Sequence, residues 1–422
     1  MKLLTRLVLL VVGLLLLGHY LPQGYWLLVA KRWPHGPVVF YSCVTKDFLF
    51  MRSTNGVMTR MDRNGKTYER PEFETVLPLD NWAQLARDGR MPKSMDGVEL
   101  SPGKIRYERM SMRIRPDMMD TPEVPLHPLL ESESGRVRLE TPGDFMRLGD
   151  GITFLSAATN AIELEKSTRF AKAFAAARFA FPAKVIAGNP NILKPYDDGY
   201  FLVDATGATF HLLQVRGEPV LRRISEVVPA AAKAQWESLK PTFVHVQEQE
   251  CREIRAFLVD QSRRPWLVVG KDFRLVPLPL EHYDPAKVTV AVRGDLFNRL
   301  ITANSEDHLE LLAFNHDYAE VGRYNEDLPT RKASAAGVTA RVLFPFTVEF
   351  EDDASGFMGF YLRAGSLGAL LVSGPCLLGF IGLLAVRKRL TSRCWPDILA
   401  VAVGGIYGVL LALLLPAQSK IS

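Results

Sequence analysis

Long apolar runs lie at the two ends of the chain, and short alternating runs fill the region between them. Residues 7–30, 364–386 and 398–417 each approach the roughly 20 apolar residues that cross a hydrocarbon core. This pattern predicts three transmembrane helices, of which the first is a signal anchor. The large middle region, residues 33–362, then lies on one side of a membrane.

Basic residues near these runs predict their orientation, because Lys and Arg in short loops mark the cytoplasmic side. Lys2 and Arg6 precede the first run, and the cluster at residues 387–393 separates the last two. We therefore expect a bacterial inner-membrane protein whose large domain faces the periplasm or exterior. The expected segments are a cytoplasmic N-terminus at 1–6, a cytoplasmic loop at 387–397 and an extracytoplasmic tail at 418–422.

The first run has an alternative interpretation as a cleaved signal peptide, because it combines a basic start with an apolar middle. Residues 19–23 are bulky and offer no small-x-small cleavage site. Tyr25 and Trp26 then resume the run with aromatics typical of a membrane interface. A retained anchor is the preferred interpretation, and cleavage is the alternative.

The middle region has short apolar or alternating segments separated by turn residues, which predict β-strands. One unit recurs: a strand ends in Asp, and an aromatic residue follows six positions later. The three examples are Asp62 with Tyr68, Asp204 with Phe210, and Asp260 with Trp266. Such repetition predicts a propeller or stacked meanders.

Asp also favours turns in general, so an irregular multi-hairpin domain is the alternative to a propeller. Short helical insertions are predicted at residues 81–87 and 164–178. The predicted fold class is therefore mainly β, propeller-like or irregular, with short helical insertions and three transmembrane helices.

The net charge of +5 is unevenly distributed along the chain. Residues 1–32 hold four basic residues and no acid, and residues 363–422 hold six basic residues and one acid. The middle region therefore has a net charge of −4. A mildly acidic domain lacks the basic surface that binds nucleic acid, so no nucleic-acid partner is expected.

Four cysteines occur, and two of them lie in the middle region. Cys43 and Cys251 could form a disulfide in an oxidising compartment, or they could be two separate thiols. No CxxC motif occurs, which excludes zinc-ribbon and thioredoxin-like sites.

Sequence motifs of common enzyme classes are absent. The chain has no complete phosphate-binding loop, no GxGxxG that opens a helix, no GxSxG and no HExxH. Its histidines are scattered, so the fold would have to assemble any metal site. The sequence therefore predicts a protein that is not an enzyme and has no cofactor and no metal.

The densest group of polar residues lies between positions 188 and 201. Its candidate ligand-binding residues are Asn189, Lys194, Tyr196, Asp197 and Asp198. Adjacent carboxylates beside a lysine could bind a cation or a polar ligand, or the segment could be a loop that turns at Asp-Asp-Gly. A second group, His316 and Asp317, has the same two interpretations.

The last apolar run carries small residues at four-residue intervals, namely Ala400, Gly404, Gly408 and Ala412. On one continuous helix they form a stripe that lets another helix approach closely. The neighbouring helix could be the span at 364–386 or a helix of a membrane-protein partner.

Several motifs together resemble an uncharacterised bacterial family of membrane-anchored domains, DUF4857. They are residues 61–66, 129–132, 142–145, 181–184, 188–190 and 198–201. The resemblance implies a membrane-anchored protein that accompanies components of ABC transporters. It implies no catalytic residues.

These patterns favour a non-enzymatic membrane protein with an extracytoplasmic β-rich binding domain, and the resemblance implies that it is an accessory of an ABC-type transport complex. Its expected partners are the lipid bilayer and a transporter subunit. The alternative is a membrane-tethered carbohydrate-binding or hydrolytic domain. A sensor is a third hypothesis, although the only loop available to carry a signal is short.

Overall fold

The structure is a computed structural model, and the chain in it divides into two compact units. It describes residues 2–30, 36–54, 56–120, 124–330, 333–351, 358–387, 390–391 and 394–415. The helical unit comprises Met1–Gly36, Ser53–Met58 and Asp327–Ser422. The β-rich unit comprises Pro37–Arg52 and Thr59–Glu326.

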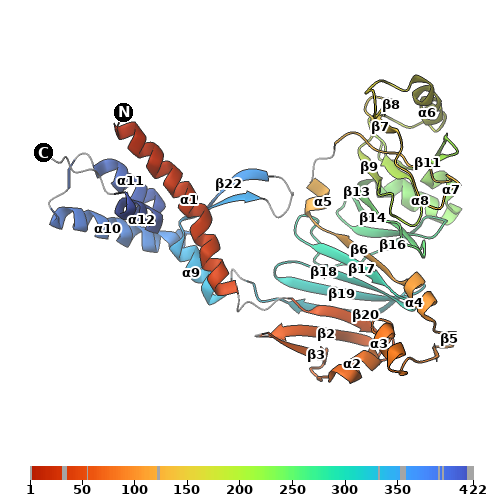
Figure 1. The fold of residues 1–422 in the computed structure, drawn as a ribbon, viewed down its shortest axis with the longest axis horizontal. Helices are drawn as coiled ribbons and strands as arrows, with labels where there is room; N and C mark the ends of the chain where they lie inside the picture. The colour runs from red at the N-terminus through yellow and green to blue at the C-terminus, as the bar shows by residue number, and fades with distance from the viewer. Residues whose placement is uncertain are drawn as a thin grey trace. The chain divides into compact units, whose positions relative to one another are not determined.

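Antiparallel meanders form the centre of the β-rich unit (Figure 1). Two four-stranded sheets have the orders β12-β11-β10-β9 and β13-β14-β15-β16, and a five-stranded sheet has the order β20-β19-β18-β17-β6. The strands are β6 (Met110–Ile114), β9 (Val185–Gly188), β10 (Tyr200–Val203), β11 (Thr209–Val215), β12 (Glu218–Arg223), β13 (Pro241–Val246), β14 (Ile254–Asp260), β15 (Pro265–Val269), β16 (Arg274–Pro277), β17 (Thr289–Gly294), β18 (Asn298–Asn304), β19 (His308–Asn315) and β20 (Glu320–Asp327).

Smaller elements surround these sheets. The remaining strands of this region are β1 (Val38–Ser42), β2 (Asp47–Thr54) and β3 (Val57–Asp62) in one sheet, and the hairpins β4 (Ser94–Met95) with β5 (Val98–Glu99) and β7 (Asp144–Leu148) with β8 (Ile152–Ser156). The helices are α2 (Arg70–Val76), α3 (Trp82–Arg87), α4 (Pro102–Glu108), α5 (Asp117–Asp120), α6 (Leu164–Ala176), α7 (Ile224–Val227) and α8 (Ala230–Leu239).

The central strands are buried on both faces because the sheets stack on one another. Along β15, Trp266 and Val268 face a core shared with β9 and β10, whereas Leu267 and Val269 face a core shared with β17 and β18. Side chains alternate between the two faces of a strand, so every position of β15 enters one core or the other. This explains why such segments appear in the sequence as continuous apolar runs.

The aspartates of the predicted repeat all occupy the same kind of turn. Asp204 Oδ1 accepts the N–H groups of Thr206 at 2.8 Å and Ala208 at 2.9 Å, two and four positions later. The same pair of bonds recurs at Asp62, Asp260 and Asn315. The third residue after each has a positive φ, and these residues are Gly65, Gly207, Arg263 and Tyr318.

The mainly β prediction with short helical insertions is confirmed. Within the described residues, the sheets stack as meanders and do not close into a propeller or a barrel. Cys43 and Cys251 are separate free thiols, Cys43 buried and Cys251 partly buried.

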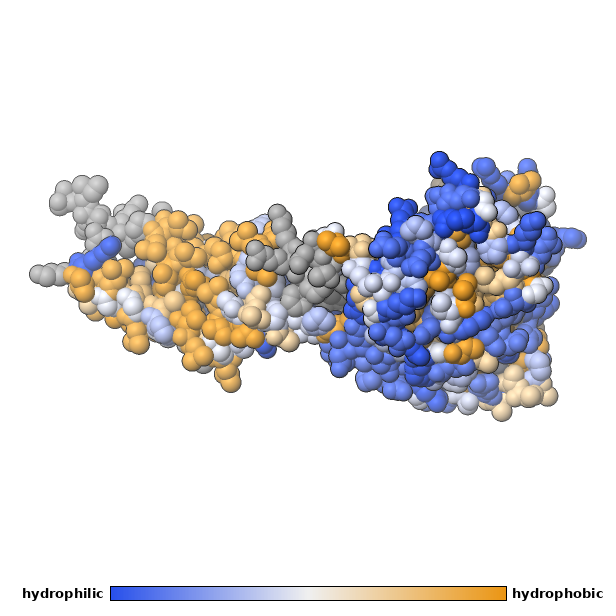
Figure 2. Space-filling model, turned by 90° about the horizontal axis from the view of Figure 1, so that it is seen from below, coloured by the Kyte–Doolittle hydropathy of each residue, from blue (hydrophilic) through white to orange (hydrophobic). Residues whose placement is uncertain are grey.

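In the helical unit, two helices are long and apolar enough to cross a membrane, judged over the described residues: Leu3–Val29 and Leu367–Val386. They correspond to α1 (Lys2–Ala30) and to η1 (Leu367–Ala369) followed by α10 (Leu370–Val386). Figure 2 shows the hydrophobic surface of this unit. Its other elements are α9 (Ala335–Leu343), β21 (Phe346–Glu351), β22 (Met358–Ala364), α11 (Trp395–Gly404) and α12 (Ile406–Leu414).

The last apolar run differs from the single span predicted at 398–417. A break at Gly405, whose φ is 48° and ψ is −119°, separates α11 from α12. A Cβ atom added to Gly408 would lie 2.3 Å from the carbonyl oxygen of Ala400, so the two short helices pack against each other. Over the described residues, the last run therefore forms two short helices in place of one full-length span, and the tail at 418–422 lies outside the described residues.

Candidate functional site

The predicted group around residues 188–201 forms a buried ionic cluster. The Lys194 ammonium contacts the carboxylates of Asp197, at 2.6 Å, and Glu248, and all three side chains are at most 3% exposed. Ser132 donates its hydroxyl to Asp197 at 2.6 Å, and Asn189 donates its amide to Glu248 at 2.8 Å. One cation is therefore shared between two carboxylates, and the hydrogen bonds from Ser132 and Asn189 further stabilise these buried charges.

Asp198 extends this cluster through a second cation. Arg255 binds its carboxylate with two hydrogen bonds, one of them Nε to Oδ2 at 2.8 Å. His211 Nε2 lies 2.7 Å from the Asp198 carbonyl oxygen. Because a carbonyl only accepts, His211 carries its proton on Nε2. Burial lowers the pKa of His211 although the charge of Asp198 opposes this, so the ring is neutral.

Tyr196 lies at the edge of the same cluster. The Arg252 guanidinium stacks 4.1 Å from the centre of its ring, and burial raises the pKa of the Tyr196 hydroxyl. The structure thus brings together the five residues predicted between 188 and 201. Their carboxylates already have partners, which favours the loop interpretation over open ligand binding.

His316 and Asp317 lie in the turn between β19 and β20. Asn315 Oδ1 accepts the Asp317 N–H at 3.0 Å, and Arg274 donates to the Asp317 carbonyl at 3.4 Å. Among the described residues, no hydrogen bond or ion pair joins this turn to the cluster around Asp197. The second predicted group is therefore a separate turn.

A cavity of about 300 Å³ lies between the edge strands β9 and β13, next to the ionic cluster. Gly188 and Pro190, from the start of the predicted loop, form part of its wall. Most of its lining residues have apolar side chains, but the surface that they present to the cavity is about equally polar and apolar. The lining comprises Met118, Val124, Leu126, His127, Pro128, Ile186, Ala187, Gly188, Pro190, Tyr200, Phe243, Val244, His245 and Val246. Apolar side chains combined with a few placed polar groups are typical of a small-molecule site.

Two histidines are among the polar side chains that line this cavity. Burial lowers the pKa values of both His127 and His245, so both rings are neutral at pH 7. A neutral imidazole has one N–H donor and one acceptor nitrogen. Tyr200 fixes the wall beside His127, because its hydroxyl donates to the Pro128 carbonyl at 3.0 Å.

Gly188 is required for this wall. A Cβ atom added to it would lie 2.5 Å from the Tyr200 ring, so any larger residue would displace the ring. The loop that begins at Gly188 is fixed in turn by Asn189 and Lys194 through Glu248. The ionic cluster therefore positions one side of the cavity.

A second cavity, of about 170 Å³, lies between β1, β6 and β17. Burial raises the pKa of Asp80. Burial also raises the pKa of Asp295, and the negative charge of nearby Asp80 raises it further. Asp295 already accepts the N–H groups of Phe297 and Asn298 in a turn. Among the described residues, no group of three or more His, Cys, Asp or Glu side chains could hold a metal ion.

The small residues of the last run pack within the chain. A Cβ atom on Gly404 would lie 2.3 Å from Leu14 of α1, and Gly408 faces the backbone of Ala400. Ala412 is half-buried on α12. Since Gly405 interrupts the helix, these residues do not form one continuous stripe.

Sequence patterns did not identify Glu248, Arg255, His127 or His245. Lys194 and Glu248 are 54 positions apart, and Asp198 and Arg255 are 57 apart. Only the stacking of one meander on the next brings them together. The single local signal was the conspicuous polarity of residues 188–201.

Comparison with known proteins gives one family. The model of a family described as a domain of unknown function, DUF4857, matches residues 38–314. This match confirms the resemblance drawn from the motifs between residues 61 and 201. No curated protein matches the chain.

Among solved structures, the chain is similar to a dihydro-heme d1 dehydrogenase, NirN, in complex with DHE. The two share 10% sequence identity, with 68% of this chain and 74% of the other covered and a TM-score of 0.22. At this score the match gives no information about the chemistry of this chain.

Proposed function

We propose, on the premise that this chain belongs to the DUF4857 family of unknown function, that it is a non-enzymatic membrane protein whose β-rich unit binds a small ligand with both apolar and polar groups outside the cytoplasm. The cavity between β9 and β13 carries this proposal. Its neutral histidines, His127 and His245, offer hydrogen bonds without an unpaired charge. Such a lining favours a molecule that combines an apolar part with a few hydrogen-bonding groups.

Exposed leucines support insertion of the helical unit into a bilayer. Leu4 is 67% exposed on α1, Leu371 and Leu378 are 73% and 72% exposed on α10, and Leu414 is 71% exposed on α12. Figure 2 shows hydrophobic residues spread over this surface. A bilayer removes such surface from water, which is favourable by about 25 cal/mol per Å².

Basic residues support an orientation with the β-rich unit outside. Lys2 and Arg6 lie in the first two turns of α1, before its apolar stretch, and the basic residues 387–389 come directly after α10 in the sequence. Short basic segments remain in the cytoplasm. Two crossings, by α1 and α10, then place the β-rich unit on the outer side, in the periplasm if the membrane is the bacterial inner one.

The α11–α12 pair is proposed to enter the membrane and return to the same side. Arg6 donates to the Asp397 carboxylate, at the start of α11, and to the Leu415 carbonyl, after α12, at 3.0 Å. Helices of 10 and 9 residues are each about 15 Å long, half of a core roughly 30 Å thick. The C-terminal end of α12 therefore belongs on the cytoplasmic side, in place of the outer side expected from three spans.

Ligand binding is tested on the full chain purified in mild detergent. Native mass spectrometry should find a small molecule bound to the wild-type protein, and Leu126→Trp should remove it, because Leu126 lines the cavity and is 40% exposed. Val137→Trp is the control, since Val137 is fully exposed and lies outside this lining. The proposal would be contradicted if mass spectrometry finds no bound small molecule and if no compound with apolar and polar groups raises the unfolding temperature.

We further propose that a transporter subunit is the membrane partner of this protein. The motivation is the family resemblance and the apolar surface of α1 and α10. Co-purification in mild detergent should recover a second membrane protein in a fixed ratio. A solitary chain under those conditions would remove this part of the proposal.

A further inference from the structure

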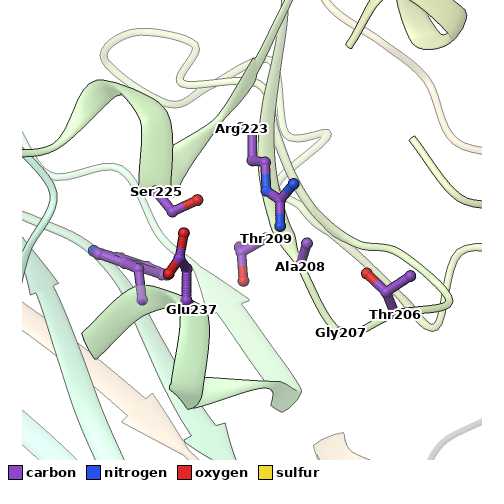
Figure 3. A pocket seen from close by; sticks show the side chains of 8 residues that line it. Thr206, Gly207, Ala208, Thr209, Arg223, Ser225 and Glu237 are labelled. Carbon is purple, nitrogen blue, oxygen red and sulfur yellow. The ribbon is translucent and has the colours of Figure 1, made fainter. Parts of the chain in front are cut away.

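A small polar cavity of about 60 Å³ lies beside the turn between β10 and β11 (Figure 3). Arg223 reaches it from the end of β12, Ser225 from α7 and Glu237 from α8, and Thr209 lies between them at the start of β11. Four separate elements therefore direct polar side chains to one place. The cavity is distinct from the larger one between β9 and β13.

Two of these side chains lack a partner among the described residues. The Thr209 hydroxyl oxygen and the Arg223 Nε atom are both buried without a hydrogen bond. Thr209 as a whole is only 4% exposed, and Ser225 is 6% exposed. Since buried polar groups are almost always paired, these two indicate an occupant that satisfies them.

The unpaired groups define the chemistry of the occupant. Arg223 Nε can only donate, and the Thr209 hydroxyl can donate. Both therefore fit an oxygen atom that carries negative charge, which gives stronger hydrogen bonds than a neutral oxygen. The size agrees, because a cavity of about 60 Å³ is several times the ~10–15 Å³ that one water requires, so it admits an occupant of a few heavy atoms.

The charged groups around the cavity further restrict the chemistry of the occupant. Arg223 is cationic, and the stem of the Lys240 side chain passes Gly207 of the lining, because a Cβ atom added to Gly207 would lie 3.0 Å from the Lys240 Cγ atom. Glu237 is anionic and exposed. An ionised carboxylate only accepts hydrogen bonds, so a favourable anion must also carry a proton to donate to Glu237.

We propose that this cavity is a binding site for inorganic phosphate in its protonated forms. Phosphate retains at least one proton near neutral pH, so it accepts from Arg223 and Thr209 and donates to Glu237. Sulfate has the same shape and retains no proton. The site should therefore select phosphate over sulfate, through repulsion between sulfate and Glu237.

Titration calorimetry of the full chain in detergent, in chloride buffer at pH 7, tests this. Inorganic phosphate should bind saturably and more tightly than sulfate. Arg223→Gln should weaken phosphate binding about tenfold or more, because it removes a charge-assisted hydrogen bond. Arg222→Gln is the matched control, since Arg222 is the exposed neighbour on the same strand and is not part of the lining.

Two further variants separate binding from folding. Thr209→Val keeps the shape of the side chain and should weaken phosphate binding. Glu237→Gln supplies a donor and should raise the affinity for sulfate, so that the preference for phosphate falls. Absence of saturable phosphate binding would overturn the proposal, as would equal effects of Arg222→Gln and Arg223→Gln or an unchanged preference in Glu237→Gln.

Glycerol phosphate distinguishes the free ion from a phosphate monoester. A monoester is mostly unprotonated at pH 8, whereas inorganic phosphate still carries a proton there. Inorganic phosphate should therefore bind more tightly at that pH. Tighter binding of glycerol phosphate would contradict the assignment to inorganic phosphate.

Discussion

Arg6 and Asp397 form an ion pair at 2.6 Å although 391 positions separate them in the sequence. The Asp397 side chain is only 5% exposed and that of Arg6 is 23% exposed. The pair joins the start of α1 to the start of α11. It places these two helix ends at one level of the helical unit, and the bond from Arg6 to the Leu415 carbonyl adds the end of α12.

Removal of either member of this pair should destabilise the helical unit. Asp397 without Arg6 is a buried charge without a partner, a change that costs about 3–5 kcal/mol in proteins. We therefore expect Arg6→Gln to lower the unfolding temperature in detergent. In Arg6→Gln/Asp397→Asn the loss should be smaller than the sum of the two single losses, and strictly additive losses would contradict direct coupling.

Replacement of Lys194 should have a large effect on the β-rich unit. Lys194→Met leaves the carboxylates of Asp197 and Glu248 facing each other without their shared cation. The expected loss of unfolding free energy is about 3–5 kcal/mol, measured by urea denaturation. Lys194→Met/Glu248→Gln should recover part of it.

Lys46→Met is the matched control for Lys194→Met. Lys46 also pairs with a carboxylate, that of Asp96, but both side chains are more than half exposed. Exposed pairs contribute little, so its urea midpoint should stay close to that of the wild-type protein. Equal losses in the two lysine variants would show that burial of the cluster is unimportant.

The turn at Asp204 gives a prediction about the repeated meanders. Asp204→Ala removes the acceptor for the N–H groups of Thr206 and Ala208, and this should cost about 2–3 kcal/mol. Asp204→Asn should cost less, because Asn315 makes the same bonds in the equivalent turn. The comparison uses urea midpoints, and equal losses in the Ala and Asn variants would contradict the role of the Oδ1 acceptor.

Buried histidines predict a loss of stability in mild acid. Burial lowers the pKa values of His127, His211 and His245 below the ordinary 6.5. As pH falls through 6.5, the unfolded chain binds protons that the folded chain does not, so stability falls below this pH. His127→Gln/His245→Gln should therefore lose less stability between pH 7.5 and 5.5 than the wild-type protein. An identical loss would show that these histidines are not the cause.

Local chemistry explains which features the sequence predicted. The Asp62, Asp204 and Asp260 turns were visible because an Asx turn depends on one side chain and the next four residues. Asn315 makes the same turn but does not fit the predicted repeat, because Asn replaces Asp there and Val321, which is not aromatic, lies six positions later. Burial on both faces likewise left continuous apolar runs that marked the strands.

Features that depend on distant residues could not be predicted in this way. The Lys194–Glu248 contact and the cavity with His127 and His245 exist only once one sheet packs on the next. The break at Gly405 was missed because glycine is common in membrane helices, so the run at 398–417 has the composition of one span. Its return is set by packing against Leu14 and Ala400.

The orientation of the chain ends tests the account most directly. In a variant without the four native cysteines, one cysteine is placed at the exposed Ser262 of the β-rich unit or after Ser422, and intact cells with a permeable outer membrane receive a membrane-impermeant maleimide. The account predicts labelling at position 262, and labelling of the C-terminal cysteine only after the inner membrane is opened. Labelling of the C-terminal cysteine in intact cells, or protection of position 262, would contradict it.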